Sequence, residues 1–227
     1  MLLYVIRHGH PDYATDSLTP LGQAQAAALP ARFLPHGLDR VFASPLGRAQ
    51  ATARPTATAL DLPIGTEDWC SENLAWGEFA LAFPDGRRHW IFDLPAFRLR
   101  PEGIPPECAA QIQYEEGYAR IRRESDAFVE RLGYRREDGL YRILRPSEEK
   151  VALFCHAGFS MVWFPYLLDV DPVWFWTSFD LTHAGIIVVR FENHPEGLTA
   201  PRCLAWSDTG PLFHAGLELK YNDEIEF

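Results

Sequence analysis

Positive charge, cysteine and long apolar runs are all scarce in this chain of 227 residues. It carries 21 Lys and Arg residues against 31 Asp and Glu residues, which gives a formal net charge of -10. A field of that sign repels nucleic acids and anionic membrane surfaces, so we expect neither as a partner. Acidic residues interrupt every apolar run before it reaches the roughly 20 residues that span a bilayer, so no transmembrane helix is predicted.

The few cysteines are scattered and form no C-x-x-C pair, which predicts free thiols in a reducing compartment. Only a short apolar stretch precedes Arg7, and no positively charged flank comes before it, so the amino terminus does not resemble a secretory signal. We therefore expect a cytoplasmic protein, and we expect neither a cofactor nor a metal. The cysteines are Cys70, Cys108, Cys155 and Cys203.

What the sequence does contain is an alternation of apolar strands and capped helices. Residues 2–6 are all apolar, as in a strand buried on both faces. Thr19, followed by proline, should begin a helix, and the unit then repeats with a strand at 41–43. Ser44, also followed by proline, should begin a second helix that runs to about residue 60. With 47% hydrophobic residues, the chain can bury a core, and we expect a single domain over 1–227.

The rest of the chain continues this α/β rhythm, which predicts a three-layer α/β/α sandwich with a mostly parallel central sheet. A turn-rich, hairpin-like connection is expected at 134–149, after a helix that Gly133 ends. The other expected elements are strands at 63–67, 151–155, 185–191 and 204–206, the last at an edge, and helices at 112–132, 157–168 and 172–179.

Between residues 68 and 111 the regular pattern fails, and we call this range the insertion segment. Such length without periodicity is typical of an active-site cover or specificity insertion, here lying over the carboxyl ends of the strands. The alternative is a packed surface loop whose arginines are merely solvated. Its conspicuous residues are the aromatics Trp76, Phe79, Phe83 and Trp90 and the cations Arg87, Arg88, Arg98 and Arg100.

Four side chains suited to phosphoryl chemistry stand at the ends of predicted strands or at a helix start. Arg7 and His8 end the first strand, His156 follows the strand at 151–155, and Arg48 lies in the first turn of a helix. The carboxyl ends of strands line the ligand crevice of an open α/β sheet, so these groups can converge. Histidine is a nucleophile and proton carrier near neutral pH, and arginine binds phosphate oxygens with a planar fork.

Short motifs around these residues resemble the histidine phosphatase superfamily, also called phosphoglycerate mutase-like. They occur in the family's order and span most of the chain, with matching strand and helix context. The motifs are Arg-His-Gly at 7–9, Leu-Thr-Pro-Leu-Gly at 18–22, Ala-Ser-Pro-Leu-Gly-Arg-Ala at 43–49 and His-Ala-Gly at 156–158.

The resemblance implies a phosphatase that works by phosphoryl transfer to the protein. His8 would attack phosphorus and form a phosphohistidine that water hydrolyses. Arg7, Arg48 and His156 would hold the phosphoryl oxygens, together with backbone N–H groups at the helix start near Ala157. The partner expected is a small phosphorylated substrate.

The family takes the leaving-group proton from a carboxylic acid just after the third strand, and Glu72 stands at about that place. Gly77 follows Glu72 by five residues, whereas the family more often has its glycine four residues after the acid. Glu78 and Asp68 therefore remain alternatives for the general acid.

The chain departs from the phosphoglycerate mutases of this family. Those usually follow Arg-His-Gly with an acidic residue and a hydroxyl residue, and carry an asparagine six residues after the histidine. Here His10, Pro11 and Ala14 stand at those places, which favours a hydrolase over a mutase-type phosphotransferase. His10, Asp12 and Tyr13 are candidate substrate contacts, and so are Arg87 and Arg88 of the insertion segment.

Two rival hypotheses belong to other classes. The spacing of His8, His10 and Asp12 also fits the H-x-H-x-D of metal-dependent hydrolases, but that motif continues with a histidine where this chain has Tyr13. Nearby arginines would also disfavour a metal ion. The other rival is a family member that binds a phosphorylated ligand without catalysis.

The later helices are rich in large aromatics, which predicts a packed core or a dimer face. A homodimer is therefore an expectation. The residues are Trp163, Phe164, Tyr166, Trp174, Phe175 and Trp176.

Overall fold

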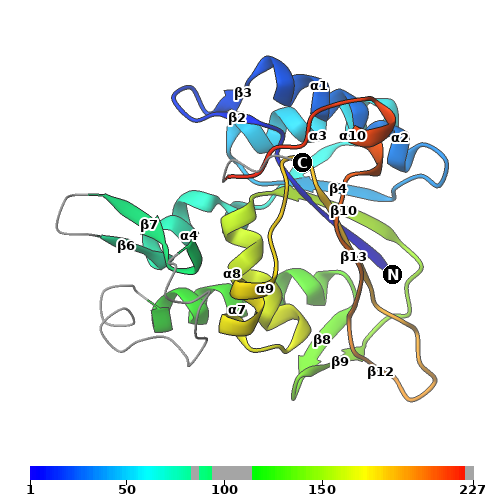
Figure 1. Ribbon diagram of the computed structural model, residues 1–227. Coiled ribbons are helices and arrows are strands. Elements are labelled where there is room, and N and C mark those ends of the chain that lie inside the picture. Colours follow the sequence, from blue (N-terminus) through cyan, green and yellow to red (C-terminus); the bar gives the residue numbers. More distant parts are fainter. Residues whose placement is uncertain (83–86, 94–113, 223–227) are drawn as a thin grey trace.

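A six-stranded sheet forms the centre of the molecule in a computed structural model that describes residues 1–82, 87–93 and 114–222 (Figure 1). The strand order is β13-β11-β1-β10-β4-β5, with β1, β10, β4 and β5 parallel and β11 and β13 antiparallel to their neighbours. The expected mostly parallel sheet is confirmed, and β13 lies at an edge as predicted. The strands are β1 Leu2–Arg7, β4 Arg40–Ala43, β5 Ile64–Thr66, β10 Lys150–Cys155, β11 Ile186–Arg190 and β13 Arg202–Asp208.

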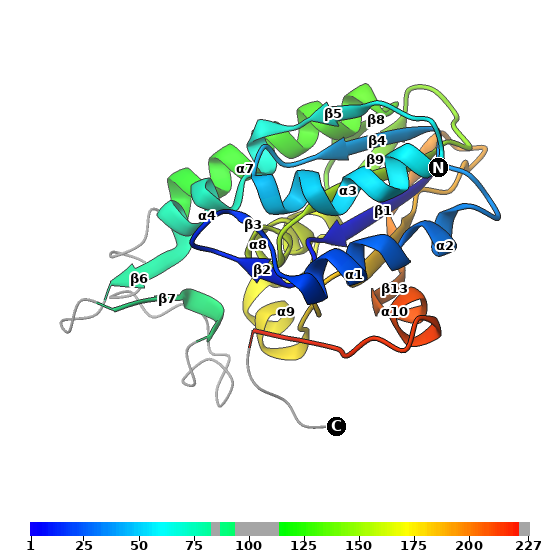
Figure 2. The ribbon, with the colours of Figure 1, turned by 90° about the horizontal axis from the view of Figure 1, so that it is seen from above.

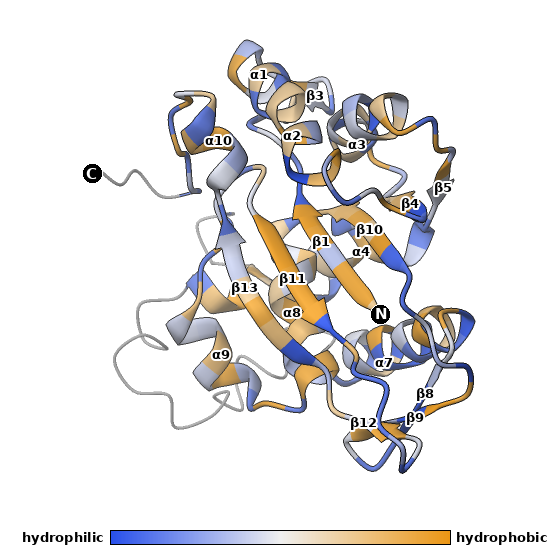
Figure 3. Cartoon of the chain, turned by 90° about the vertical axis from the view of Figure 1, so that its right-hand side faces the viewer, coloured by the Kyte–Doolittle hydropathy of each residue, from blue (hydrophilic) through white to orange (hydrophobic). Residues whose placement is uncertain are grey.

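The central strand β1 is apolar throughout because it is covered on both faces. Leu3 and Val5 belong to one hydrophobic cluster, and Tyr4 and Ile6 belong to the other, as the alternation of side chains along a strand requires. Figure 3 shows β1 and β11 as hydrophobic strands between two layers of helices. Burial on both faces fixes the register of β1 and hence the place where the strand ends.

Helices cover both faces of the sheet, which confirms the three-layer α/β/α fold. In Figure 3 the helices of the chain's first quarter and α10 lie on one side, and the later helices α7, α8 and α9 lie on the other. The first layer holds α1 Pro20–Ala28, α2 Pro30–Phe33, α3 Gly47–Ala59 and α10 Gly210–His214, and the second holds α4 Glu72–Phe79, α7 Tyr114–Arg131, α8 Ala157–Leu168 and α9 Pro172–Ser178.

Smaller sheets of two or three strands lie outside the central sheet. The predicted hairpin-like connection after Gly133 is confirmed as the pair β8–β9, which β12 extends to three strands. Figure 2 shows that the β6–β7 hairpin lies beyond the carboxyl ends of β1 and β4, which the arrowheads mark. The remaining elements are β2 Pro11–Asp12, β3 Ser17–Leu18, β6 Ala80–Ala82, β7 Arg88–Trp90, β8 Tyr134–Glu137, β9 Leu140–Ile143, β12 Leu198–Thr199 and the 3-10 helices Asp68–Cys70 and Ile91–Asp93.

One of the two predicted helix starts is correct and the other is wrong. The hydroxyl of Thr19 accepts the N–H of Gly22 at 3.2 Å and caps α1, as expected. Ser44 does not cap a helix, because α3 begins only at Gly47. The backbone N–H of Ser44 instead continues the sheet by bonding to the carbonyl of Phe154, and its hydroxyl is committed elsewhere.

The insertion segment is more regular than its sequence suggests, since α4 and the β6–β7 hairpin lie within it. The periodicity of α4 is weak because few of its residues are fully buried. Phe83, Arg98 and Arg100 lie outside the described residues, and so does Cys108. The other three cysteines are free thiols, as predicted. Over the described ranges, none of the helices combines the length and apolar character that crossing a bilayer requires.

Candidate active site

Two histidines emerge side by side because two parallel strands end in register. Arg7, the last residue of β1, lies opposite Cys155, the last residue of β10. The residue after each strand is a histidine, and the ring centroids of His8 and His156 are 5.2 Å apart. The expectation that these strand ends meet at one edge of the sheet is thus confirmed.

A third histidine reaches the same edge from the antiparallel strand β11. Because β11 runs the other way, the residues before it lie beside the carboxyl end of β1. The N–H of Ala184 donates to the carbonyl of His8 at 3.0 Å, and the rings of His8 and His183 are 5.7 Å apart. Ala184 holds a left-handed φ of 56°, a conformation that costs an alanine on the order of 1 kcal/mol. Such strain is found where the surrounding structure fixes a functional turn.

His8 presents one ring nitrogen without a proton to the site. Its Nδ1 lies 2.8 Å from the carbonyl of Gly9, an acceptor only, so Nδ1 carries the proton and Nε2 keeps its lone pair. The ring is 1% exposed. Burial lowers the pKa of His8 well below its usual value, and the neighbouring His156 and Arg7 lower this pKa further. His8 is therefore a neutral imidazole suited to nucleophilic attack.

The loop after His8 is pinned to α1 by a close approach of two glycines. A Cβ on Gly9 would lie 2.6 Å from the carbonyl oxygen of Gly22, and a Cβ on Gly22 would lie 2.1 Å from that of His10. The N–H of Gly9 also donates to the hydroxyl of Thr52 at 3.0 Å. Both glycines are thus required for the backbone contact that places His8.

Arg7 is almost fully buried and is held from three sides. It donates to the carbonyl of Leu181, to Nε2 of His183 at 2.6 Å and to Oδ1 of Asn222 at 2.5 Å. His183 accepts at Nε2 because its Nδ1 donates to the carbonyl of Lys220 at 2.8 Å. Burial lowers the pKa of His183, and Arg7 and His8 lower it further, so the ring stays neutral. These contacts fix the orientation of the guanidinium.

Arg48 lies in the first turn of α3, as predicted, and faces the same site. Its Nη1 donates to Oδ1 of Asp16 at 2.5 Å, and its Nη2 donates to Oε2 of Glu72 at 2.9 Å. Asp16 also accepts the N–H of Gly47 at 2.6 Å, which ties the loop after β2 to the start of α3. The ring of Tyr13 lies beneath the guanidinium, with its centroid at 5.3 Å.

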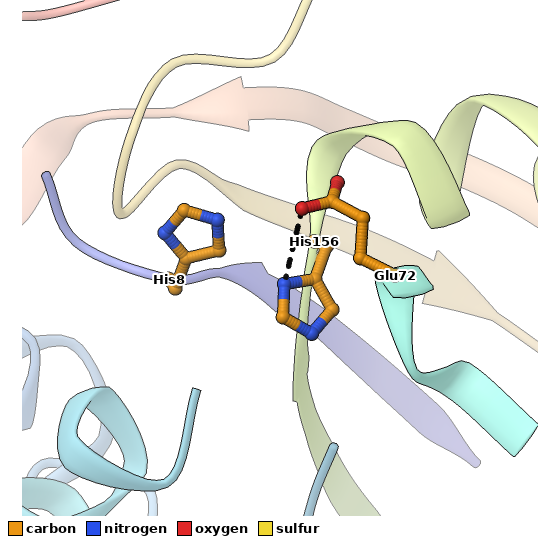
Figure 4. A group of neighbouring side chains, drawn as sticks. All are labelled: His8, Glu72 and His156. Atoms are coloured by element: carbon orange, nitrogen blue, oxygen red, sulfur yellow. Dashed lines mark ion pairs between the residues drawn. The ribbon is translucent and has the colours of Figure 1, made fainter. Parts of the chain in front are cut away.

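Glu72 opens α4 and points toward the histidine pair (Figure 4). Its Oε1 accepts the N–H of Gly158 at 3.0 Å, and its Oε2 lies 3.6 Å from Nδ1 of His156. The two alternative acids lie elsewhere. Glu78 forms a two-pronged ion pair with Arg120, at 2.5 and 2.7 Å, and Asp68 is exposed and does not line the cavity.

His156 is fully buried, and its ring makes one hydrogen bond. Its Nε2 shares a proton with the hydroxyl of Ser44 at 2.8 Å, while its Nδ1 has no hydrogen-bond partner within the described residues. Burial, then Arg48 and Arg7, lower the pKa of His156 well below its usual value. When Ser44 donates to Nε2, the Nδ1–H of His156 is free to bind an anion.

Arg7, Arg48, Glu72 and His183 line a cavity of about 930 Å³, whereas the buried His8 and His156 are not among its lining residues. Of the candidate substrate contacts, His10 and Tyr13 line it, and the insertion segment contributes Glu72, Asn73, Trp76, Trp90 and Asp93. The insertion segment is therefore part of the cavity wall, which favours its interpretation as a specificity insertion. The lining residues are Arg7, His10, Pro11, Tyr13, Asp16, Leu46, Arg48, Glu72, Asn73, Trp76, Trp90, Asp93, His183, Tyr221 and Asn222.

Other candidate contacts lie away from the cavity lining. The carboxylate of Asp12 is taken up by its own turn, where it accepts the N–H of Ala14 and the hydroxyl of Thr15. Arg87 and Arg88 are exposed, and Arg88 donates to backbone carbonyls of the insertion segment. None of the three is among the residues that line the cavity.

The alternative of a metal site on His8, His10 and Asp12 does not match the geometry. Over the described ranges, the group whose potential ligand atoms lie within 4.8 Å of one another is His8, Glu72 and His156. Asp12 is not part of this group, because the chain enters the short strand β2 directly after the loop that holds His8. The site combines instead the neutral imidazole of His8, two arginines, a second buried imidazole and a carboxylate, a set that suits transfer of a phosphoryl group.

Several residues of the site have no counterpart in the sequence-based prediction. Asp16, Ser44, Thr52 and Asn222 each hold a predicted residue in place. Ser44 lies in a motif already singled out, although for a different reason, whereas Asn222 comes from the far end of the chain and carries no local signal.

Comparison with known proteins agrees with this geometry. The model of the histidine phosphatase superfamily (branch 1) matches residues 3–203. A search of curated protein sequences finds no match.

Solved structures share the fold at low sequence identity. Phosphoserine phosphatase from Entamoeba histolytica aligns with a TM-score of 0.63 and 20% identity, covering 93% of this chain and 98% of its own. Mycobacterial glucosyl-3-phosphoglycerate phosphatase aligns with a TM-score of 0.62 and 19% identity, covering 92% and 99%. The alpha-ribazole phosphatase from Shigella flexneri aligns with a TM-score of 0.57 and 18% identity, covering 92% and 96%.

Proposed function

The chain belongs to the histidine phosphatase superfamily, and from this premise we propose that it hydrolyses a phosphomonoester through a phosphohistidine on His8. The observation that carries the proposal is the hydrogen bond from Nδ1 of His8 to the carbonyl of Gly9. It leaves Nε2 unprotonated and aimed at a site that two arginines border. Phosphatase names among the structural neighbours agree with a hydrolase.

In the first step, Nε2 of His8 attacks phosphorus in line with the leaving oxygen. The new N–P bond forms as the P–O bond to the alcohol breaks, and the electron pair goes to the alcohol oxygen. Arg7, Arg48 and the Nδ1–H of His156 hold the three equatorial oxygens, assisted by backbone N–H groups at the start of α8. Glu72 donates the proton that the leaving oxygen needs.

Glu72 must change partners for this step. In the structure its carboxylate accepts hydrogen bonds from the N–H of Gly158 and from one nitrogen of Arg48. An incoming phosphoryl group competes for both donors, and its negative charge favours the protonated form of the carboxyl group that it displaces. In the second step, water attacks the phosphorus of the phosphohistidine while the same carboxylate takes a proton from that water, which restores the acid. The N–P bond breaks as the new P–O bond forms, its electron pair returns to Nε2 of His8, and inorganic phosphate leaves.

Other features of the protein remain predictions. We propose that the substrate is a small phosphorylated molecule, that the described elements form one domain and that the protein is cytoplasmic. A homodimer is also proposed, with Trp174 as an exposed aromatic on α9, and sedimentation of the purified protein tests it.

The test of the function is hydrolysis of p-nitrophenyl phosphate. We expect phosphate release by the wild-type protein, no loss of activity in a metal chelator, and a loss of more than about 10⁴-fold in His8→Ala. Binding of phosphate without any hydrolysis supports the non-catalytic alternative. Loss of activity in chelator and its return with zinc or manganese supports the metal-dependent one.

A further inference from the structure

The cavity beyond the phosphate site has an aromatic wall, which we define as Tyr13, Trp76 and Trp90. The Tyr13 residue is 62% exposed although its ring centroid lies only 6.5 Å from that of His8. The indoles of Trp76 and Trp90 meet edge to face, with centroids 4.8 Å apart. An exposed aromatic ring so close to a nucleophile is placed to contact the part of the substrate that leaves.

Trp90 joins this wall directly to the phosphate site. A Cβ added to Gly158 would lie 2.3 Å from the indole of Trp90, so the indole packs against the bare backbone there. The N–H of that same glycine donates to Glu72, the proposed proton donor. Trp90 is also stacked on Phe92, at 5.1 Å and 14°, which holds the indole in place. The apolar surface therefore begins where the leaving oxygen must lie.

The charges of the cavity argue against a second anionic group on the substrate. Among the lining residues that the structure describes, the arginines and lysines are Arg7 and Arg48, and both lie at the phosphate end. Arg48 is already shared by two carboxylates, Asp16 and Glu72. Arg88 lies over the ring of Trp76, at 5.5 Å from its centroid, but it donates to the backbone carbonyls of Trp76 and Ala80 and is not among the lining residues. Within the lining that the structure describes, a carboxylate or second phosphate on the leaving group would therefore meet the aromatic wall without a matching cation.

We propose that Tyr13, Trp76 and Trp90 form the leaving-group subsite, and that the substrate is the phosphomonoester of an uncharged alcohol bearing an aromatic or similarly planar apolar group. This inference rests on the proposed function and adds the class of substrate. Ring-to-ring contact supplies affinity and orientation, while the single charged group is held by the arginines.

The test compares three alkyl phosphates whose alcohols leave with similar ease: 2-phenylethyl phosphate, n-propyl phosphate and the phosphate ester of 3-hydroxypropanoate. We expect kcat/KM to be at least about 10-fold higher for the phenylethyl ester than for the propyl ester, and lowest for the carboxylate. Trp76→Ala should remove most of the phenylethyl advantage, and Trp76→Phe should retain it. Phe213→Ala, a change at an exposed aromatic residue outside the cavity, is the matched control.

Equal kcat/KM values for the phenylethyl and propyl esters, with activity still dependent on His8, would overturn the subsite and leave the proposed function standing. So would equal losses on both esters in Trp76→Ala. If no ester is hydrolysed, the proposed function fails, and the subsite is then tested by calorimetric binding of 2-phenylethylphosphonate and propylphosphonate. At least about 10-fold tighter binding of the first supports the subsite, and equal affinity contradicts it.

Discussion

Arg48 donates to Oε2 of Glu72 at 2.9 Å, so the proposed proton donor occupies a direction of the guanidinium that a phosphoryl oxygen needs. The second oxygen of Glu72 likewise accepts the N–H of Gly158 at the start of α8. The carboxylate thus lies where the substrate's oxygens are expected. Binding and acid catalysis are coupled in this arrangement, because the group that leaves the anion site is the one that must deliver a proton.

Glu72→Gln should separate these two effects. For an alkyl phosphate, whose leaving oxygen needs a proton, kcat/KM should fall by about 10²-fold or more, because kcat/KM reports the first step. For p-nitrophenyl phosphate, whose leaving group needs none, the loss in kcat/KM should be much smaller, and inorganic phosphate should inhibit at least as well as before. Steady-state kinetics on both esters measures this. Glu78→Gln, which weakens the pair with Arg120, should show no such dependence on the leaving group; the same dependence there would move the acid to Glu78.

Ser44→Ala tests whether the hydroxyl of Ser44 determines which ring nitrogen of His156 carries the proton. Without it, the buried Nε2 of His156 loses its hydrogen bond, and unfolding should become easier by about 1–3 kcal/mol. The Nδ1–H tautomer is then no longer favoured, so kcat/KM should fall by about 10-fold. Nitrogen NMR of the His156 ring reads the tautomer directly. An unchanged tautomer with unchanged activity would show that Ser44 only fills space.

The three neutral histidines of the site predict that stability falls in mild acid. Burial lowers the pKa of His8, His156 and His183, so in the folded state they stay neutral below the ordinary value of 6.5. Unfolding lets each ring bind a proton, so stability is present above pH 6.5 and is lost as the pH falls below it. Each ring adds a slope of about 1.4 kcal/mol per pH unit, about 4 for the three.

Denaturant unfolding between pH 5 and 7 measures this slope. His183→Gln should reduce it by about a third, whatever it does to stability at pH 7. His214→Gln, at an exposed site, should leave the slope as it is. Equal slopes for the wild type and His183→Gln would mean that His183 is protonated in the fold.

Gly158→Ala should push Trp90 away from the phosphate site. The new methyl group would lie 2.3 Å from the indole, and overpacking of this kind costs about 1–3 kcal/mol. The shift also disturbs the N–H that Glu72 accepts, so kcat/KM should fall. Gly77→Ala is a matched helical control with open space around the new Cβ, and it should stabilise the protein by up to about 1 kcal/mol. Thermal unfolding and kinetics of both variants check the contrast.

The part of the site that the sequence predicts consists of residues at or shortly after the carboxyl ends of parallel strands. Arg7, His8 and His156 follow strands whose apolar patterns fix their register, and Arg48 lies in the first turn of a helix that follows β4. Sequence order alone therefore placed all four at one edge of the sheet. The assignment of His8 as the attacking residue comes from the family resemblance and stays a prediction.

The rest depends on contacts between segments far apart in the chain. Asn222 reaches Arg7 across 215 positions. The α4 helix carries Glu72 and Trp76, but its sequence shows no clear helical periodicity because the helix buries few side chains. The pattern at Ser44, serine before proline, predicts a helix cap, but it also fits a strand end whose hydroxyl holds an imidazole.

The central claim is that Nε2 of His8 carries the phosphoryl group. Brief exposure to a radiolabelled phosphate ester, followed by quenching in base, should trap a phosphoenzyme that is stable in base and labile in acid. Peptide mapping and phosphorus NMR should then place the phosphate on His8, in the Nε2 isomer, because Nδ1 donates to Gly9. Label that persists in His8→Ala, or the Nδ1 isomer on His8, would contradict the account.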